Sequence, residues 1–140
     1  MARRAPRNRT IELTAADRRR YQQEVLTLQE PRLFAEDLLD RTIQGDLKEV
    51  LPCLPDGFVD LVVADPPYNL GKNFNGRLWP KLPLGDYQAW LKTWLPAMRR
   101  LLQPHGSIYV CCDWRCSAAV QEVLEAHFVV RSRITWEREK

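Results

Sequence analysis

Residues 58–68 read FVDLVVADPPY, an apolar run that ends in an acid, two prolines and an aromatic residue. The apolar part is typical of a parallel strand that is buried on both faces. The strand cannot continue past Asp65, because Pro66 and Pro67 lack the N–H that a sheet ladder needs. A helix cannot start there at once, since the residue before a proline is held in an extended conformation. We therefore expect a strand over 58–64 with a stiff loop at its carboxyl end, where open α/β sheets bind ligands.

The rest of the chain alternates between helical and strand patterns. Hydrophobic spacing predicts helices over 15–29, 31–39, 47–51, 86–102 and 113–126, and further strands over 41–46, 107–112 and 128–136. Candidate helix caps are Thr14 (with Asp17 in a capping box), Asp46, Asp86 and Asp113, and Pro96 predicts a break. Such alternation predicts an α/β fold with a mostly parallel sheet and helices on both faces, the last strand lying near a sheet edge.

Two smaller expectations concern burial and loops. In the predicted helix 31–39, with Pro31 in its first turn, the apolar side chains expected to face inward are Leu33, Phe34, Leu38 and Leu39. Residues 69–85 show no periodicity, and a loop of that length in a compact domain is usually functional.

Composition bounds the class of protein. The 140 residues make one domain at most, and 45% of them are hydrophobic, as in globular chains. No apolar run is long enough to span a membrane and no signal peptide is recognisable, so we expect a cytoplasmic protein without a membrane partner. Residues 1–20 hold seven arginines and two acids, a local charge of +5, while the other 120 residues sum to −2.

This asymmetry divides the chain into two expected regions. Residues 1–30 form a basic arm, partly disordered or helical, and residues 31–140 form the folded part. A basic arm suits contact with phosphates, although a merely solvated terminus explains it equally well. The four cysteines, at positions 53, 111, 112 and 116, lack a zinc-binding spacing, so we expect reduced, mostly buried thiols and no metal.

Two hydrogen-bond acceptors and a flat ring meet in the loop after the strand. The Asp65 carboxylate can accept an N–H or take up a proton, and the Pro66 carbonyl is a second acceptor held rigid by the next proline. Two close acceptors suit an exocyclic amine, which presents two N–H groups, and Tyr68 can stack on a planar ring. Holding both hydrogens frees the nitrogen lone pair for attack on an electrophile placed in line. The loop therefore predicts a pocket for an aromatic amine such as adenine or cytosine.

The motif at residues 65–68 resembles the catalytic motif of the DNA amino-methyltransferases, which transfer a methyl group from S-adenosylmethionine to N6 of adenine or N4 of cytosine. The resemblance extends from about residue 42 to residue 137. The matching segments, in order, are 43–46 (IQGD), 60–72 (DLVVADPPYNLGK), 102–110 (LQPHGSIYV) and 134–137 (ITWE).

The resemblance implies an S-adenosylmethionine-dependent enzyme that flips a base out of double-stranded DNA, and aspartate at the first motif position favours adenine over cytosine. The implied catalytic residues are Asp65, Pro66, Pro67 and Tyr68; the implied cofactor contacts are Asp46 and Asp65; the implied substrate contacts are Tyr68, Asn69 and Lys72. Asp46 is equally well explained as a plain helix cap, and Asn69 and Lys72 as residues of a solvated loop. Phe74 and Trp79 either contact the base or cover the core.

One family feature is missing. The family's glycine-rich cofactor loop, of Phe-x-Gly-x-Gly type, has no match, because the six glycines are scattered singly. In permuted members that begin with the catalytic half, that loop lies near the C-terminus. The chain is therefore similar to the N-terminal half of such an enzyme, with an incomplete Rossmann-like methyltransferase sheet, and we expect a C-terminal half to supply the cofactor loop.

Two other functions remain open at this point. An Asn/Asp-Pro-Pro-Tyr loop also occurs in enzymes that methylate structured RNA or protein glutamine, so the acceptor amine need not belong to DNA. The chain could also be an inactive remnant that binds DNA through its basic arm. The segments around the motif and the long 69–85 stretch favour DNA methylation.

Overall fold

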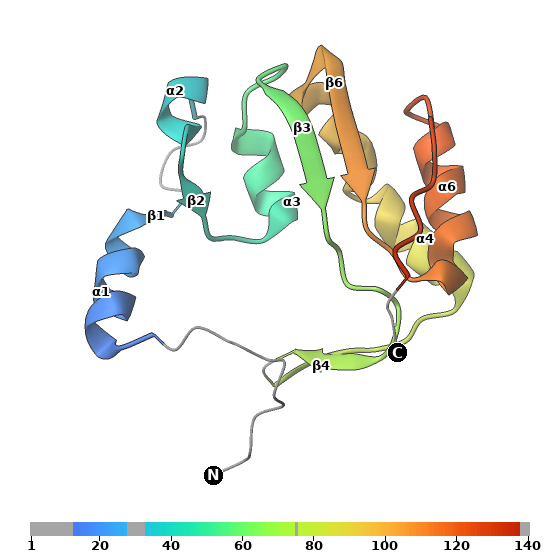
Figure 1. The fold of residues 1–140 in the computed structure, drawn as a ribbon, viewed down its shortest axis with the longest axis horizontal. Helices are drawn as coiled ribbons and strands as arrows, with labels where there is room; N and C mark the ends of the chain where they lie inside the picture. The colour runs from blue at the N-terminus through green and yellow to red at the C-terminus, as the bar shows by residue number, and fades with distance from the viewer. Residues whose placement is uncertain (1–12, 28–32, 75, 138–140) are drawn as a thin grey trace.

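The computed structural model describes residues 13–27, 33–74 and 76–137 of the chain. Figure 1 shows the order of the elements and their labels. They are α1 (Ala15–Glu24), β1 (Val25–Leu26), α2 (Ala35–Leu38), β2 (Thr42–Ile43), α3 (Leu47–Val50), η1 (Leu51–Cys53), β3 (Val59–Ala64), β4 (Lys72–Phe74), β5 (Arg77–Trp79), α4 (Leu84–Lys92), η2 (Leu95–Ala97), α5 (Met98–Leu101), β6 (Leu102–Val110), η3 (Trp114–Cys116) and α6 (Ser117–Glu125).

The centre of the fold is the parallel pair β3–β6. Ala64 lies opposite Val110 in this pair, and Val62 lies opposite Ile108. A crossover through α4, η2 and α5 joins the two strands, as the predicted strand–helix alternation requires. The α/β class and its parallel strands are therefore confirmed. The described strands form three two-stranded sheets, β1–β2, β3–β6 and β4–β5, in place of one larger sheet.

The hydrophobic core lies on one face of β3–β6. Its fully buried side chains come from α4, η2 and α6: Tyr87, Leu91, Leu95 and Val123. The strand residues Val62, Ala64, Ile108 and Val110 pack against this cluster. Burying such side chains stabilises the fold by about 1.5–3 kcal/mol for each large one.

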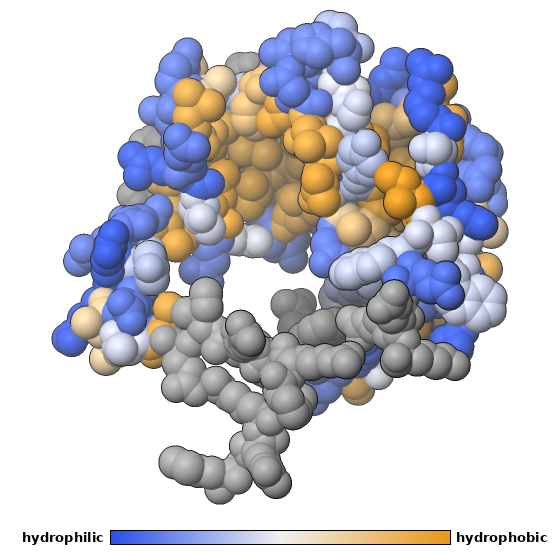
Figure 2. Space-filling model, viewed as in Figure 1, coloured by the Kyte–Doolittle hydropathy of each residue, from blue (hydrophilic) through white to orange (hydrophobic). Residues whose placement is uncertain are grey.

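The opposite face of the pair is exposed, so the prediction of a strand buried on both faces is wrong for the described residues. Leu61 and Val63 are 54% and 64% exposed. Tyr109, the register partner of Val63, is 51% exposed. The reason is that alternate side chains point to opposite faces, and the described helices cover only one of them. Figure 2 shows the resulting apolar surface over β3.

Helix α1 begins as predicted and ends earlier than predicted. Asp17 N donates to Thr14 Oγ1 at 3.1 Å, and Thr14 N donates to Asp17 Oδ2 at 2.9 Å, which completes the capping box. The helix stops at Glu24, because Val25 and Leu26 pair in parallel with Thr42 and Ile43. The predicted arm over 1–30 thus contains a paired segment; its residues 1–12 lie outside the described residues, and its boundary stays a prediction.

The second helix is one turn long. It covers Ala35–Leu38, and Pro31 lies outside the described residues. Phe34 and Leu39 are 68% and 70% exposed, so the prediction that they face inward is wrong. Leu33 and Leu38 are half-buried. A single turn has too few internal hydrogen bonds to bring four apolar side chains to one face.

The central helical region breaks where proline requires it. Helix α4 begins after Pro83, which corrects the predicted start at Asp86, now within the first turn. Thr93 and Trp94 leave the helix, and Pro96 enters the 3₁₀ turn η2, so the predicted break is confirmed. Strand β6 then begins at Leu102, five residues before the predicted start.

The predicted strand over 128–136 is wrong. Residues 129–137 have no regular secondary structure, and all of them are exposed. The fractions are 73% for Ile134 and 88% for Trp136. A strand exists only where a neighbour accepts and donates its backbone hydrogen bonds, and no described strand lies beside this segment. Alternating hydrophobicity alone did not supply that partner.

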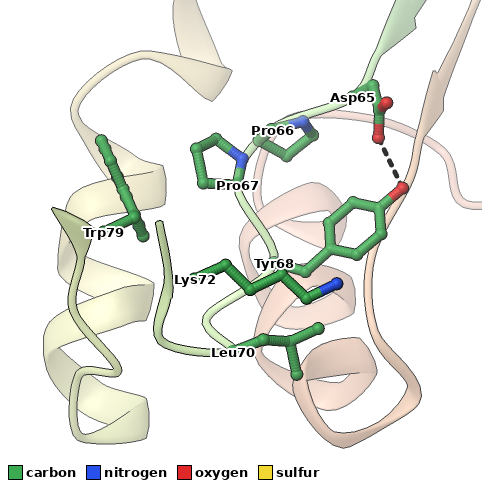
Figure 3. Close-up of a pocket in the computed structure, with 7 residues that line it drawn as sticks. All are labelled: Asp65, Pro66, Pro67, Tyr68, Leu70, Lys72 and Trp79. Atoms are coloured by element: carbon green, nitrogen blue, oxygen red, sulfur yellow. Dashed lines mark hydrogen bonds between the residues drawn. The ribbon is translucent and has the colours of Figure 1, made fainter. Parts of the chain in front are cut away.

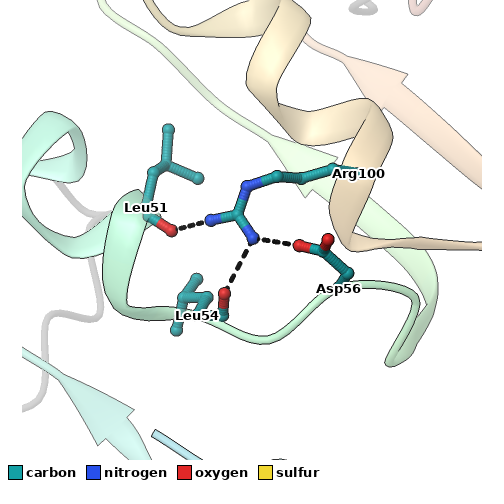
Figure 4. A network of polar contacts seen from close by, with 4 residues as sticks. All are labelled: Leu51, Leu54, Asp56 and Arg100. Atoms are coloured by element: carbon teal, nitrogen blue, oxygen red, sulfur yellow. Dashed lines mark hydrogen bonds and ion pairs between the residues drawn. The ribbon is translucent and has the colours of Figure 1, made fainter. Parts of the chain in front are cut away.

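Arg100 fastens α5 to the segment before β3. Its guanidinium donates to the carbonyl oxygens of Leu51 and Leu54, the latter at 2.8 Å, and pairs with Asp56 (Figure 4). Gly57 N and Phe58 N donate to the carbonyls of Arg100 and Leu101 in the same region. These bonds set the start of β3 relative to the helices behind it.

Three further expectations can be compared with the described residues. Among the described residues, no helix is long and apolar enough to cross a membrane. The four thiols are free; Cys116 is buried, and the other three are half-buried. Within the same residues, no cluster of three metal-binding side chains occurs.

Candidate active site

The motif Asp65–Tyr68 lies at the carboxyl end of the parallel pair, as predicted. It follows β3 directly and has no regular secondary structure. Cys111 N donates to the carbonyl oxygen of Ala64 at 2.8 Å, the last ladder bond before the two chains separate. The prolines then prevent further pairing, so the motif stands clear of the sheet.

Asp65 and Tyr68 contact each other. The Tyr68 hydroxyl donates to Asp65 Oδ1 at 2.5 Å (Figure 3). This hydrogen bond, and to a lesser degree burial, raises the pKa of Tyr68 above its ordinary value, since the neutral phenol is the form that donates. Asp65 is exposed, and its second oxygen makes no hydrogen bond within the described residues. One carboxylate oxygen is thus available to a ligand.

The two proline carbonyls of the motif differ in their partners. The Pro67 carbonyl accepts from the Tyr87 hydroxyl at 3.1 Å and from Asn69 N at 3.2 Å. The Pro66 carbonyl accepts no hydrogen bond from the part of the chain that the structure describes. Burial raises the pKa of Tyr87 to about 12, so this hydroxyl stays a donor at neutral pH. Only the Pro66 carbonyl remains an open acceptor.

Asn69 holds the loop from below. It is 5% exposed, and its amide makes two hydrogen bonds with the backbone of Leu82, Nδ2 to O at 2.9 Å and N to Oδ1 at 2.6 Å. Such a paired contact fixes the loop against the segment that leads into α4. This geometry favours a positioning role for Asn69, and its predicted contact with substrate stays a prediction.

A cavity of about 380 Å³ adjoins the motif. Its walls are formed by Asp65, Pro66, Pro67, Tyr68, Leu70, Lys72 and Trp79 (Figure 3). The volume lies in the range of small-molecule sites, and most of the lining is apolar with few polar groups. The cavity thus brings together all four predicted catalytic residues and Lys72.

Lys72 and Trp79 reach the cavity through a hairpin that the sequence prediction missed. Strands β4 and β5 are antiparallel, with Lys72 opposite Trp79. In Figure 3 the Trp79 indole and the Tyr68 ring lie on opposite sides of Pro67. Trp79 also packs edge-on against Trp90, with ring centroids 5.3 Å apart. The Asn75-Gly76 dipeptide, a strong signal for a two-residue hairpin turn, could have revealed this element.

Asp46 lies outside the cavity. It caps α3, accepting from Lys48 N at 2.9 Å, as the sequence predicts. Its side chain is exposed beyond the end of β2, and its contact with a cofactor stays a prediction. The structure therefore gathers five of the seven predicted site residues and leaves Asn69 and Asp46 around them.

Comparison with known proteins agrees with this geometry. The family model N6_N4_Mtase, described as DNA methylase, matches residues 59–140. The type II methyltransferase M.HpaI of Haemophilus parainfluenzae is 33% identical over 98 residues, which cover 69% of this chain and 31% of that protein. The DNA adenine methyltransferase YhdJ of Escherichia coli (strain K12) is 33% identical over 109 residues, covering 76% of this chain and 36% of the relative.

A third relative is the type II methyltransferase M.BglII of Bacillus subtilis, 38% identical over 79 residues, which cover 56% of this chain and 21% of that protein. The chain thus spans about a third or less of the length of these curated relatives. The family model begins at the first residue of β3 and includes the motif and the whole cavity lining. Because that match covers more than half of the chain, the chain belongs to the DNA methylase family N6_N4_Mtase.

Proposed function

We propose that the chain is the base-binding, catalytic part of a DNA methyltransferase that transfers a methyl group from S-adenosylmethionine to an exocyclic base amine, with adenine N6 favoured. The observation that carries the proposal is the cavity at Asp65–Tyr68, whose wall joins a free carboxylate oxygen, an open backbone carbonyl and an aromatic ring. These groups match the two N–H groups and the flat face of an aminated base.

The proposed chemistry depends on positioning. The Asp65 carboxylate and the Pro66 carbonyl each accept one N–H of the amine, which makes the nitrogen lone pair available. When bound, S-adenosylmethionine supplies an electrophilic methyl group on a sulfonium. A carbon–nitrogen bond forms as the carbon–sulfur bond breaks, and the sulfur leaves with the electron pair as a neutral thioether. The nitrogen then loses a proton, which Asp65 accepts and passes to solvent.

Two aromatic walls would hold the base. Tyr68 stands beside the carboxylate with its ring fixed by the hydrogen bond to Asp65. Trp79 lines the other side of the cavity on β5. Stacking of one base on an aromatic ring contributes about 1–3 kcal/mol. Lys72, on the rim with its ammonium group, suits a nearby phosphate or an acceptor on the base.

The preference for adenine has two supports. Aspartate stands at the first position of the motif, which in the resembling family favours adenine. One relative, YhdJ, carries the name DNA adenine methyltransferase. The type II names of the other relatives support a restriction–modification role. Double-stranded DNA is the proposed partner, with the target base flipped out of the duplex, because the amine is not accessible inside it.

The residues present fit one side of the cofactor. The free oxygen of Asp65 and the exposed carboxylate of Asp46 suit hydroxyl, amine or ammonium groups. Within the described residues, the glycines stand singly in turns and loops, with no run that could cradle the rest of the cofactor. We therefore propose that a C-terminal half supplies the glycine-rich loop and completes the sheet.

The test is transfer of tritiated methyl groups to DNA by the whole enzyme of which this chain forms the N-terminal half. Asp65→Ala should reduce the rate by a factor of about 100 or more, the range for loss of one acid–base group. The matched control is Asp60→Ala, an exposed aspartate on the same strand and outside the cavity. Full activity of Asp65→Ala would contradict the proposed role of this carboxylate.

Two further arms separate the remaining functions. Assays with RNA and with a glutamine peptide test the other acceptor amines, and transfer to either in preference to DNA would reject the DNA assignment. Calorimetry of S-adenosylmethionine binding to the isolated chain tests the need for a second half. We expect weak binding, and micromolar affinity would show that the cofactor side is already complete.

A further inference from the structure

A second cavity, of about 340 Å³, adjoins the first. Its lining consists of Asn69, Leu70, Lys81, Leu82, Pro83, Leu84, Asp113, Arg115 and Cys116. Leu70 lines both cavities, so the two spaces lie on either side of one residue of the catalytic loop. A strand of nucleic acid whose base occupies the first cavity would therefore continue past the second.

The second cavity carries two unneutralised cations. Lys81 and Arg115 are exposed, and neither forms a salt bridge with a carboxylate among the described residues. Asp113 is the one acid in the lining, and its Oδ1 accepts from Arg115 N at 3.0 Å, capping η3. The lining thus has one more positive than negative charge, and its acid is engaged by the backbone.

Both cations act on the same point of the wall. Burial raises the pKa of the Cys116 thiol, while the charges of Lys81 and Arg115 act in the opposite direction. A charge affects a thiol in this way only from nearby. Lys81 comes from the segment before α4 and Arg115 from η3, so two distant parts of the sequence converge on one cavity.

The backbone around the cations is held against the catalytic loop. The two hydrogen bonds between Asn69 and Leu82 fix the residue next to Lys81. A Cβ added at Gly71 would lie 3.5 Å from the Cβ of Lys81, so the two segments are in direct contact. On the other side, Cys116 N donates to the Asp113 carbonyl at 2.9 Å and closes the turn that carries Arg115.

We propose that Lys81 and Arg115 bind a backbone phosphate of the nucleotide next to the target base. The inference rests on the proposed function, because it takes the first cavity as the base pocket. Guanidinium offers a fork of N–H donors that matches phosphate oxygens, and lysine adds a point charge. Because phosphate contacts position a nucleic acid without reading its sequence, this subsite would fix the strand so that the base reaches Asp65.

The test compares binding of a labelled single-stranded oligonucleotide, all thymine except for one central adenine, by fluorescence anisotropy. The variant is Lys81→Gln/Arg115→Gln, and the control is Lys92→Gln/Arg99→Gln, which removes two exposed cations outside both cavities. We expect the cavity variant to lose about tenfold in affinity and its salt dependence to fall by about 0.7 per released phosphate contact. Circular dichroism checks that both variants stay folded.

A charge-free linkage locates the contact. Replacing a single phosphate next to the adenine by methylphosphonate should weaken binding to the wild-type chain and leave binding to the cavity variant unchanged. The same replacement several nucleotides away should affect both proteins equally. Equal losses in the two double variants, an equal effect of the adjacent methylphosphonate on both proteins, or no binding by the wild-type chain at low salt would overturn the phosphate subsite.

The base pocket is judged by a separate arm. An oligonucleotide of thymine alone should bind more weakly than the adenine-containing one, and Asp65→Ala should abolish that difference. Loss of the adenine preference alone would count against the proposed function while the phosphate contact, seen in the methylphosphonate series, stands. Loss of the methylphosphonate effect with the adenine preference intact would reject the subsite and keep the base pocket.

Discussion

The hydroxyl of Tyr87 donates a 3.1 Å hydrogen bond to the carbonyl oxygen of Pro67. Tyr87 is fully buried in α4, whereas Pro67 lines the cavity, so this bond ties the catalytic loop to the core. It also occupies the second proline carbonyl and leaves the Pro66 carbonyl as the open acceptor. The core thus decides which carbonyl of the motif can meet a ligand.

Tyr87→Phe should destabilise the chain by about 0.5–1.5 kcal/mol, the usual net value of one hydrogen bond. The aromatic ring stays, so its stacking on Trp90, with centroids 5.5 Å apart, is kept. Chemical denaturation followed by fluorescence measures the change. In the whole enzyme, the turnover number should fall while the KM for DNA changes little, because the variant loosens the loop and leaves the cavity walls in place.

The matched control for this change is Tyr109→Phe. Tyr109 is 51% exposed on β6, and its hydroxyl makes no hydrogen bond within the described residues. Removing that hydroxyl should leave stability within about 0.5 kcal/mol of wild type, as for most surface changes. Equal effects of the two substitutions would contradict the link between Tyr87 and the loop.

The Tyr68–Asp65 bond predicts a response to alkaline pH. The folded-state pKa of Tyr68 is raised above the ordinary 10.0, first by the hydrogen bond to Asp65 and then by burial. The stabilisation from this bond is therefore complete below pH 10 and is lost as the pH rises through the folded-state pKa. Phenolate absorbance of wild type minus Tyr68→Phe isolates the titration of this one residue.

Asp65→Ala should move that titration down toward 10.0, because the largest cause of the raised pKa is removed. The comparison uses Asp65→Ala with and without Tyr68→Phe, and far-ultraviolet circular dichroism shows the pH range over which each protein stays folded. If Tyr68 titrates at the same pH in both backgrounds, the two side chains do not form the hydrogen bond in solution.

The local rules of the sequence predicted the elements that depend on neighbouring residues. The Thr14–Asp17 capping box, the Asp46 cap and the break at Pro96 are all present, since each follows from a few consecutive residues. The strand at 59–64 and its abrupt end were predicted for the same reason. Elements that need a distant partner were not: the last strand has no neighbour, and Val25–Leu26 left a helix to pair with β2.

The candidate site divides in the same way. The motif at 65–68 and Lys72 were predicted from consecutive residues and meet in one cavity. Trp79 was left undecided between core and site, because its position depends on the β4–β5 pairing. The roles of Tyr87, Lys81 and Arg115 could not be predicted, since each depends on contacts between segments that are distant along the chain or brought together only by folding.

Arg100→Ala should destabilise the chain by about 2 kcal/mol or more, given that a hydrogen bond to a charged group is worth about 1.5–3 kcal/mol. The substitution leaves the carbonyls of Leu51 and Leu54 without this donor, whereas the pair with the 73%-exposed Asp56 contributes little. Arg99→Ala, the exposed neighbour, is the control, and denaturant midpoints are the measurement. A loss below about 0.5 kcal/mol for Arg100→Ala, the surface value, would show that α5 is held by apolar packing alone.

Trp79→Ala should weaken binding of an adenine-containing oligonucleotide by about 1–3 kcal/mol, the value of one base stacked on an aromatic ring. Trp79→Phe, which keeps a flat wall on the cavity, should restore part of the affinity. Because Trp79 also packs on Trp90, a general effect on folding must be separated from stacking. An oligonucleotide with an abasic site in place of the adenine makes that separation, as its affinity should not change in Trp79→Ala.

The matched control is Trp136→Ala, which removes an 88%-exposed indole outside both cavities. It should bind the adenine and abasic oligonucleotides as wild type does. If Trp79→Ala weakens binding of both oligonucleotides equally, Trp79 supports the hairpin and does not touch the base. A loss confined to the adenine oligonucleotide places the indole against the base, opposite Tyr68, because only a stacked ring distinguishes a base from a gap in the same backbone.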